Sequence, residues 1–241
     1  MLLLVLAATT LNTWPGNISK VEGANMVTGV SPLATPIHNL WGAPKNEKVD
    51  LTLAKTDNSV SWTWSRPDPV KKPGISYVQP IYPSARITLK TPVEVSEIKS
   101  FNLFADYNYT QKPAGSYNLA FDIFLREKGK SGDNRKSEIM IWLAASKECP
   151  ARKDGEYNIN GSAYSLCVNT DWNPGVTYMA FVLEGESIPQ RLPIHEFIKI
   201  AIQKGYVDPD AYLAAVELGP EIWWGEGEAS LRDYRLLIKV D

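Results

Sequence analysis

Ser137-Glu138-Ile139-Met140-Ile141-Trp142-Leu143 is the stretch that says most about this chain, because its apolar and β-branched residues predict a strand. Successive side chains of a strand point to opposite faces, so the three aliphatic residues share one face and Glu138, Met140 and Trp142 share the other. A buried carboxylate needs a matching cation, and none is adjacent on this stretch. The pattern therefore indicates a strand with one core face and one face that forms the floor of a groove for a ligand such as a sugar ring.

Length and composition limit the class of protein. A chain of 241 residues can bury one large core, and all-β domains often reach this length as one unit. The 25 Lys and Arg are nearly balanced by 27 Asp and Glu without a basic cluster, which argues against a nucleic-acid partner. No apolar run approaches the roughly 18 residues of a membrane span. Eight Trp and eleven Tyr suit both a sandwich core and a surface on which sugar rings stack.

Most of the chain reads as short strands separated by turns, which is typical of a β-sandwich or jelly roll. Seventeen Pro and sixteen Gly punctuate the intervals, and we find no internal repeat. We expect strands at residues 49–53, 60–65, 85–89, 95–103, 116–126, 138–144, 163–168, 176–183, 211–218 and 230–240.

One segment, residues 193–205, follows the spacing of an amphipathic helix rather than that of a strand. Pro193 suits a first helical position, and Gly205 suits the residue just past the end. We expect a single structural helix packed on the outer, convex sheet.

A second acidic stretch, Val216-Glu217-Leu218-Gly219-Pro220-Glu221-Ile222-Trp223, lies near the C-terminus. In a strand, Glu217, Glu221 and Trp223 share a face with Gly219, whose missing side chain leaves room for a ligand or for an approaching backbone. Hydrolysis of a glycosidic bond needs two carboxyl groups that flank it. Glu138 and one of these two glutamates can supply them, and parity alone leaves both Glu217 and Glu221 open as the acid/base.

Six short motifs in the right order resemble those of glycoside hydrolase family 12, the small jelly-roll endoglucanases and xyloglucanases. One of them, the turn motif Ser76-Tyr77, departs from the family pattern, because Ile75 stands before it where the family usually has Lys. The motifs are Asn39-Leu40-Trp41-Gly42, Trp62-Thr63-Trp64-Ser65, Ser76-Tyr77, Phe121-Asp122-Ile123-Phe124, the 137–143 stretch and Leu218-Gly219-Pro220-Glu221.

This resemblance implies a fold and a mechanism. The fold is all-β, a jelly-roll sandwich of two antiparallel sheets with a concave substrate cleft and one α-helix on the convex side. The activity is that of a retaining endo-β-1,4-glucanase without metal or organic cofactor. Glu138 is then the nucleophile and Glu221 the general acid/base. Asp122 hydrogen-bonds the nucleophile, and we expect it to share a proton with Glu138.

Eight further residues are candidates for substrate binding. The resemblance places Asn39 and Trp41 on the non-reducing side of the cut, and Met140 and Trp142 beside the nucleophile. We choose Trp64 over Trp62 as a cleft residue. The full set is Asn39, Trp41, Trp64, Tyr77, Met140, Trp142, Trp172 and Trp223.

The ends and the cysteines leave alternatives open. We place a single catalytic domain at residues 26–241, after an N-terminal segment, residues 1–25, that is a leader remnant or a first strand. Cys149 and Cys167 form one disulfide or remain two buried thiols. We expect export to the extracellular space and a monomer. Residues 147–161 and 224–228 depart from the family pattern, and we expect both to border the ends of the cleft.

Other functions compete with endoglucanase. A xyloglucan-specific endoglucanase of the same family has the same motifs. A non-catalytic carbohydrate-binding module explains the aromatic residues but not two facing carboxylates. A xylanase on a related jelly roll is disfavoured by the motif at residues 39–42.

Overall fold

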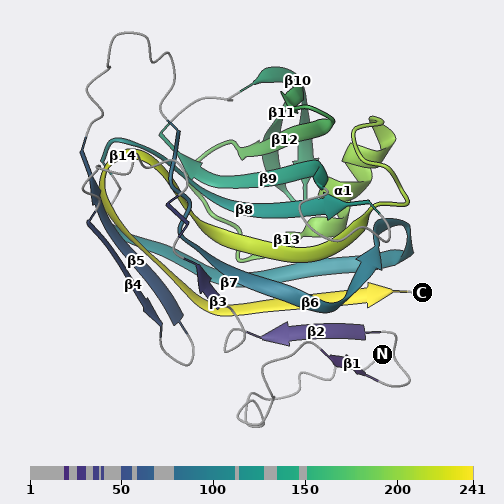
Figure 1. The fold of residues 1–241 in the computed structure, drawn as a ribbon, viewed down its shortest axis with the longest axis horizontal. Helices are drawn as coiled ribbons and strands as arrows, with labels where there is room; N and C mark the ends of the chain where they lie inside the picture. Colours follow the sequence, from purple (N-terminus) through teal and green to yellow (C-terminus); the bar gives the residue numbers. More distant parts are fainter. Residues whose placement is uncertain are drawn as a thin grey trace.

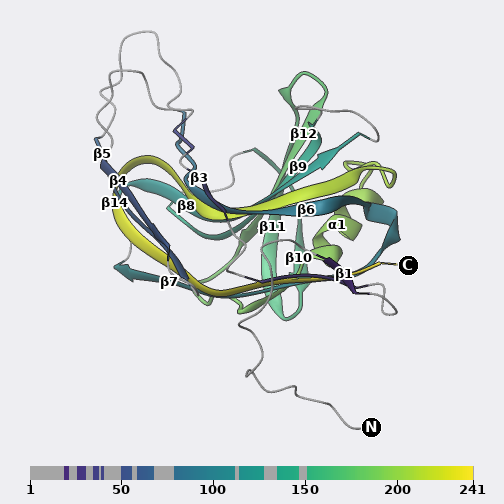
Figure 2. The same cartoon turned by 60° about the horizontal axis from the view of Figure 1, so that its bottom comes forward.

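The computed structural model describes residues 19–21, 26–30, 35–37, 39–40, 50–55, 59–67, 79–111, 114–127, 135–146 and 151–240. In this part the chain forms fourteen strands, one α-helix and one short 3₁₀ helix, η3 (Val95–Glu97). The strands form two curved layers that face each other (Figures 1 and 2). The expected all-β jelly-roll class is confirmed.

One long strand, β14 (Tyr212–Val240), belongs to both layers. Its first half pairs with β6 (Ser84–Glu94) and β8 (Ser116–Arg126) in the layer that we call sheet B. Its second half pairs with strands of the other layer, sheet A. Figure 2 shows β14 curling from one layer to the other at the left of the view. The two expected strands at residues 211–218 and 230–240 are therefore one continuous strand, and residues 224–228 are its bend.

Glycine makes this bend possible. Gly225 has a positive φ of 107°, and a Cβ atom on it would lie 2.1 Å from the carbonyl oxygen of Ala114. Any other residue here would push away the segment that leads into β8.

Sheet B carries the acidic stretches. All of its strand pairs are antiparallel except β9 with β12, which is parallel. Its order is β3 (Thr35–Ile37), β6, β14, β8, β9 (Arg135–Ala145), β12 (Val176–Leu183), β11 (Ser162–Asn173) and β10 (Arg152–Ile159).

Sheet A closes the other side of the core around the second half of β14. Residues 19–21, which we had assigned to the N-terminal segment, already pair with this sheet as β1. The strands of sheet A besides β14 are β1 (Ser19–Val21), β2 (Met26–Val30), β4 (Asp50–Lys55), β5 (Ser59–Arg66), β7 (Ile98–Gln111) and β13 (Arg191–Pro193).

The alternation predicted for residues 137–143 is confirmed. Ile139, Ile141 and Leu143 of β9 belong to the main core between the sheets, whereas Met140 and Trp142 belong to a second cluster on the opposite face. We call that opposite face of sheet B the site face.

The predicted helix is present as α1 (Ile194–Gln203), with Pro193 just before it and Gly205 in the left-handed region just after it. The ring of Phe197 meets Tyr164 of β11 and Phe181 of β12 edge-to-face, both at 5.0 Å between centroids. The helix therefore covers the core side of sheet B and leaves the site face to other residues. In the described part of the chain, no helix is long and apolar enough to cross a membrane.

The sequence analysis placed no strand within residues 147–161, but residues 152–159 form the edge strand β10, which pairs with β11 through a turn at Asn160 and Gly161. Polar side chains suit an edge strand, which explains why this segment shows no apolar alternation. Cys167 is disulfide-bonded, and the other cysteine of the chain, Cys149, lies outside the described residues.

Candidate active site

A row of paired residues crosses the middle of the site face. Glu217 of β14 lies opposite Asp122 of β8, which lies opposite Met140 of β9. The row continues through Ala180 of β12 to Cys167 of β11. Because side chains alternate along each strand, Glu138 on β9 and Glu221 on β14 project from this same face, one on either side of β8.

Asp122 is a buried acid at the centre of this group, with 3% of its surface exposed, and its Oδ1 has no hydrogen-bond partner among the described residues. Burial raises the pKa of Asp122 well above its ordinary value, and the negative charges of Glu138, Glu217 and Glu221 raise it further. Arg135 opposes this rise. The three glutamates thus lie near enough to act on one central carboxyl group, which favours a protonated Asp122.

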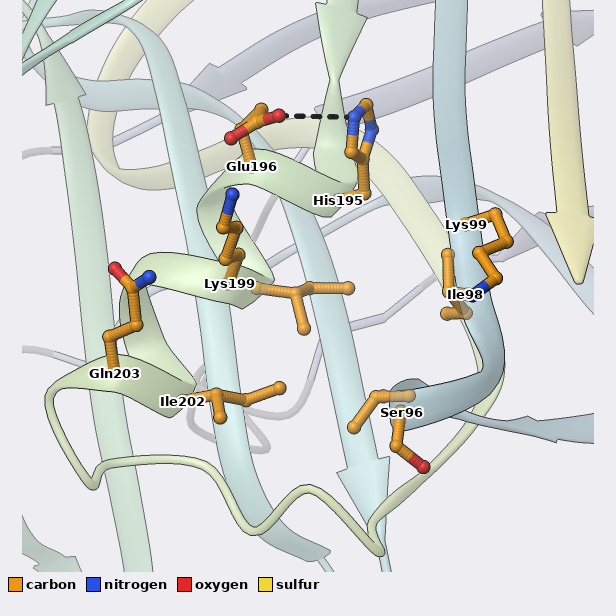
Figure 3. A pocket seen from close by; sticks show the side chains of 10 residues that line it. Ser96, Ile98, Lys99, His195, Glu196, Lys199, Ile202 and Gln203 are labelled. Carbon is orange, nitrogen blue, oxygen red and sulfur yellow. Dashed lines mark ion pairs between the residues drawn. The ribbon is translucent and has the colours of Figure 1, made fainter. Parts of the chain in front are cut away.

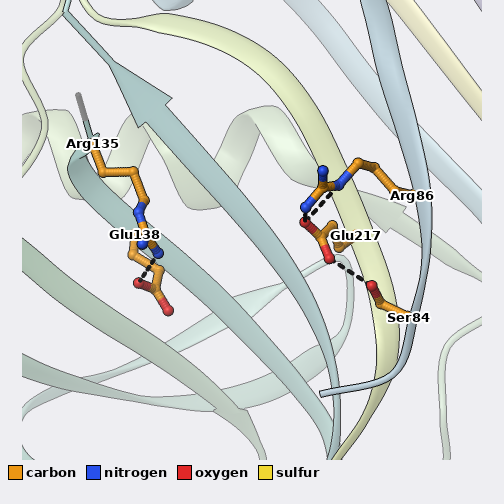
Figure 4. A network of polar contacts seen from close by, with 5 residues as sticks. All are labelled: Ser84, Arg86, Arg135, Glu138 and Glu217. Carbon is orange, nitrogen blue, oxygen red and sulfur yellow. Dashed lines mark hydrogen bonds and ion pairs between the residues drawn. The ribbon is translucent and has the colours of Figure 1, made fainter. Parts of the chain in front are cut away.

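Glu138 lies at the accessible end of β9, with 13% of its side chain exposed. Nη1 of Arg135 lies 3.7 Å from its Oε2 (Figure 4). The expectation that no cation accompanies Glu138 on its strand is wrong, because Arg135 begins β9 and its guanidinium folds over the ring of Phe124, 4.8 Å from the centroid, on the way to Glu138. A nearby cation favours an ionised carboxylate.

Glu221 receives a hydrogen bond from a residue that the sequence analysis did not select. Nδ2 of Asn118 on β8 donates to its Oε2 at 2.5 Å, and Asn118 is fully buried. The sequence could have indicated Asn118, because it is four residues before Asp122 and so shares the face of Asp122 in a strand.

Glu217 is engaged in a different way. The hydroxyl of Ser84 donates to its Oε2 at 2.5 Å, and Nε of Arg86 donates to its Oε1 at 2.8 Å, with Nη2 of Arg86 on the same oxygen (Figure 4). Both carboxylate oxygens therefore accept donors from β6, and the side chain is only 2% exposed. This arrangement favours Glu221 over Glu217 as the acid/base.

Two buried tyrosines border the acidic group and were also missed. The hydroxyl of Tyr178 on β12 donates to Sδ of Met140 at 3.3 Å, and that of Tyr82 donates to the carbonyl of Ala120 at 3.1 Å. Burial raises the pKa of both phenols well above the ordinary value, and the charges of Asp122 and Glu221 contribute in each case. Both phenols therefore stay neutral hydrogen-bond donors.

Aromatic and sulfur-containing side chains form the floor of the site face. Trp142 and Trp223 lie with their ring centroids 6.4 Å apart, in one cluster with Met140 and Tyr178. Their exposed fractions are 1% for Trp142, 6% for Trp223 and 3% for Met140. They are thus a packed support beneath the carboxyl groups rather than an open stacking surface.

The remaining substrate-binding candidates divide into three groups. Asn39 is half-buried, and its carbonyl accepts the backbone N–H of Tyr82 at 2.9 Å, which places it beside a residue whose phenol borders the acidic group. Trp64 is 2% exposed and packs with Trp62 in the main core, so the structure corrects the expectation that it lines the cleft. Parity could not reveal this, because both faces of a sandwich strand can be covered. Trp41, Tyr77 and the side chain of Trp172 lie outside the described residues.

A cavity of about 340 Å³ lies elsewhere, between α1 and the η3–β7 segment (Figure 3). Among the described residues that line it, Glu196 is the one carboxylate, and it pairs with Nε2 of His195 at 3.3 Å. The described lining therefore offers no second acid for hydrolysis, and the site face remains the candidate active site.

Comparison with known proteins identifies the same class of enzyme. Residues 35–238 match the model of glycosyl hydrolase family 12. Endoglucanase S of Pectobacterium parmentieri is 25% identical over 217 residues, which cover 84% of this chain and 80% of that protein.

Solved structures agree in fold. A family 12 xyloglucanase from Bacillus licheniformis, in complex with ligand, superposes with a TM-score of 0.72 at 20% identity, over 88% of this chain and 99% of that one. An endoglucanase from Rhodothermus marinus gives 0.70 at 22% identity, over 93% and 96%.

Proposed function

Given that this chain is a member of glycosyl hydrolase family 12, and so a glycoside hydrolase, we propose that it cuts internal β-1,4-glucosidic bonds of soluble or amorphous β-glucan with retention of configuration. The observation that carries the proposal is the convergence of Asp122, Glu138 and Glu221 from three adjacent strands, β8, β9 and β14, on one face.

In the first step, Oε of Glu138 attacks the anomeric carbon and the bond to the leaving sugar oxygen breaks. Glu221 gives its proton to that oxygen. The cation of Arg135 at 3.7 Å supports Glu138 as the ionised nucleophile. Asp122, whose raised pKa favours the protonated form, can donate a hydrogen bond to that carboxylate, so the two share one proton.

In the second step, water attacks the anomeric carbon, the ester bond to Glu138 breaks, and the proton of the water passes to Glu221. Glu221 must be ionised to accept it, and the amide of Asn118 at 2.5 Å stabilises that form. Met140, Trp142 and Trp223 support the two glutamates from below. Asn39, Trp41, Tyr77 and Trp172 remain proposed substrate contacts.

Export to an oxidising compartment is part of the proposal. A disulfide at Cys167 persists where thiols are not kept reduced, which fits an extracellular enzyme acting on a polymer too large to enter a cell.

The experiment is an assay for new reducing ends on carboxymethyl-cellulose, barley β-glucan, xyloglucan and xylan. We expect the first two to be cut, with a fall in viscosity that precedes most of the sugar release because the cuts are internal. Faster cutting of xyloglucan would favour the specificity of the Bacillus licheniformis relative. Folded protein that binds oligosaccharide without cutting any of the four would instead indicate a binding module.

A further inference from the structure

Glu217 is a fourth carboxylate of the site face, and the double displacement gives it no role. Its Oε2 accepts the hydroxyl of Ser84 at 2.5 Å, and its Oε1 accepts Nε of Arg86 at 2.8 Å. Arginine stays protonated throughout the working range of an enzyme. The contacts therefore hold Glu217 as a carboxylate in a fixed orientation.

The two halves of this ion pair lie on neighbouring strands, and the cationic half is one strand further from Asp122. Sheet B runs in the order β6, β14, β8, so Arg86 on β6 lies on the side away from Asp122, and its side chain is 41% exposed. Glu217 itself lies directly opposite Asp122, at 2% exposure. Water screens the outer, cationic half more than the inner half, so the field at Asp122 keeps the sign of the carboxylate.

The other charged and titratable groups around Asp122 come from every neighbouring element. β9 contributes Glu138 and Arg135, and β14 contributes Glu221 as well as Glu217. The phenols of Tyr178 on β12 and Tyr82 before β6 also feel the charge of Asp122. Glu217 is bound on both oxygens, by a hydroxyl and a guanidinium, which makes it a constant charge beside Asp122.

We propose that Glu217, oriented by Arg86 and Ser84, is a positioning residue whose fixed negative charge keeps one proton within the group formed by Asp122, Glu138 and Glu221. The role rests on the proposed function, because that proton is the one the hydrolysis uses. In the free protein, the retention of this proton is also a property of the fold, so it can be measured without substrate. The upper pH limit of the enzyme is then tuned from β6, by Ser84 and Arg86 acting through Glu217.

Two single variants should shift the pH profile in opposite directions, and the double variant tests whether the shifts cancel. Glu217→Gln removes the charge at nearly constant volume and leaves the cation of Arg86, so the group releases its proton earlier and the alkaline limb of the activity profile moves down by about 0.5–1 pH unit. Arg86→Met leaves the carboxylate without its cation, and the limb moves up by a similar amount. The double variant removes both charges, and its limb returns toward that of the parent.

The experiment uses the whole chain and two readouts. The first is the pH profile of hydrolysis of barley β-glucan. The second is an NMR titration of the side-chain carboxyl carbons of Asp and Glu in free protein, with Asp122→Asn to assign the signal of Asp122. The matched control is Arg232→Met, which breaks the surface pair with Asp106 (2.9 Å) in sheet A and should move neither readout.

Shifts of opposite sign that cancel in the double variant support the proposal. An unmoved Asp122 signal in Glu217→Gln, or shifts of the same sign in both single variants, overturn it. Should Arg86→Met not fold, Glu217→Gln carries the test alone, because the arginine it leaves behind is partly exposed to water. Expected NMR shifts without hydrolysis of any glucan would refute the proposed function and leave the electrostatic role intact.

Discussion

Asn118 on β8, which is fully buried, donates its side-chain amide to the half-buried Glu221 on β14 at 2.5 Å. An N–H donor suits the ionised glutamate that acts as base, but it opposes the protonated glutamate that acts as acid. Oδ1 of Asn118 has no hydrogen-bond partner in the part of the chain that the structure describes. A half-turn of the amide would present that oxygen to the protonated acid, so Asn118 can serve both halves of the cycle.

Removing this amide should change the pH dependence as well as the rate. In Asn118→Ala the carboxylate of Glu221 loses a donor worth about 1.5–3 kcal/mol, so we expect kcat to fall roughly tenfold to a hundredfold and the alkaline limb to move to higher pH. The measurement is kcat between pH 4 and 9 on barley β-glucan. Asn108→Ala, at an exposed position of β7, is the control. An unchanged limb would show that Asn118 does not act on Glu221.

The assigned roles of Glu138 and Glu221 can be separated by the leaving group. Glu138→Gln should lose at least about 10⁴-fold in kcat on every substrate, since no nucleophile remains, while its affinity for cello-oligosaccharides is kept. Glu221→Gln should lose as much on glucan but form the glycosyl-enzyme from aryl glycosides with acidic leaving groups, which need no proton.

Glu97→Gln, at an exposed position of η3, is the matched control for both glutamate variants and should keep full activity. Burst kinetics with a dinitrophenyl cellobioside distinguish the roles. A burst with Glu138→Gln, or none with Glu221→Gln, would mean that the two roles are exchanged or misplaced.

The raised pKa of Asp122 has a consequence for stability. The folded chain holds this proton above pH 3.8, where the unfolded chain releases it, so the free energy of unfolding falls as the pH rises toward the folded pKa. The variant Asp122→Asn has no carboxyl group at this position, so its free energy of unfolding does not fall with pH in this way. We therefore expect the variant to gain stability relative to the parent with rising pH, by up to about 1.4 kcal/mol per pH unit above pH 4.

Urea unfolding of both proteins at pH 4, 5, 6 and 7 measures this difference. Asp106→Asn, which alters a surface carboxylate in sheet A, should show no such rise. A difference between Asp122→Asn and the parent that stays constant across the series would mean that Asp122 is ionised throughout.

Much of the fold could be predicted because alternation is a local property. Residues 116–126 and 176–183 were predicted with the observed bounds of β8 and β12, and the helical spacing of residues 193–205 located α1. The continuity of β14 could not be predicted, because Pro220 and the glycines near the bend are typical of a turn in isolation. Only the neighbouring strands of both sheets hold this segment extended.

For the candidate site, the sequence supplied chemical types but not partners. It selected Glu138, Glu221 and Asp122 from motif and parity. It missed Arg135, Asn118 and the Arg86–Glu217 pair, since these contacts depend on register between strands that are far apart in the chain. Trp64 was assigned to the cleft wrongly for a related reason. The alternation of its strand fits either face, and only the packing of sheet A against sheet B shows that Trp64 points into the main core.

Gly219 provides a test of the geometry around Glu217 and Glu221, which flank it on β14. A Cβ atom at Gly219 would lie 2.1 Å from the carbonyl oxygen of Pro83 and 2.9 Å from Cα of Ser84, both of them backbone atoms. The missing side chain therefore makes room for a backbone and not for a ligand. Gly219→Ala must push β6 away from β14, and we expect a loss of about 3 kcal/mol or more in the free energy of unfolding, with a lower kcat.

Gly205→Ala provides the comparison, because Gly205 also lacks a side chain but meets nothing within 4 Å and lies after α1, on the far side of sheet B. Its φ of 74° alone should cost about 1 kcal/mol and leave kcat unchanged. Urea unfolding and kcat of the two variants decide the matter. If Gly219→Ala costs no more than Gly205→Ala, β6 can move away from β14 freely, and the rigid placement of Ser84 and Arg86 against Glu217 would be lost with it.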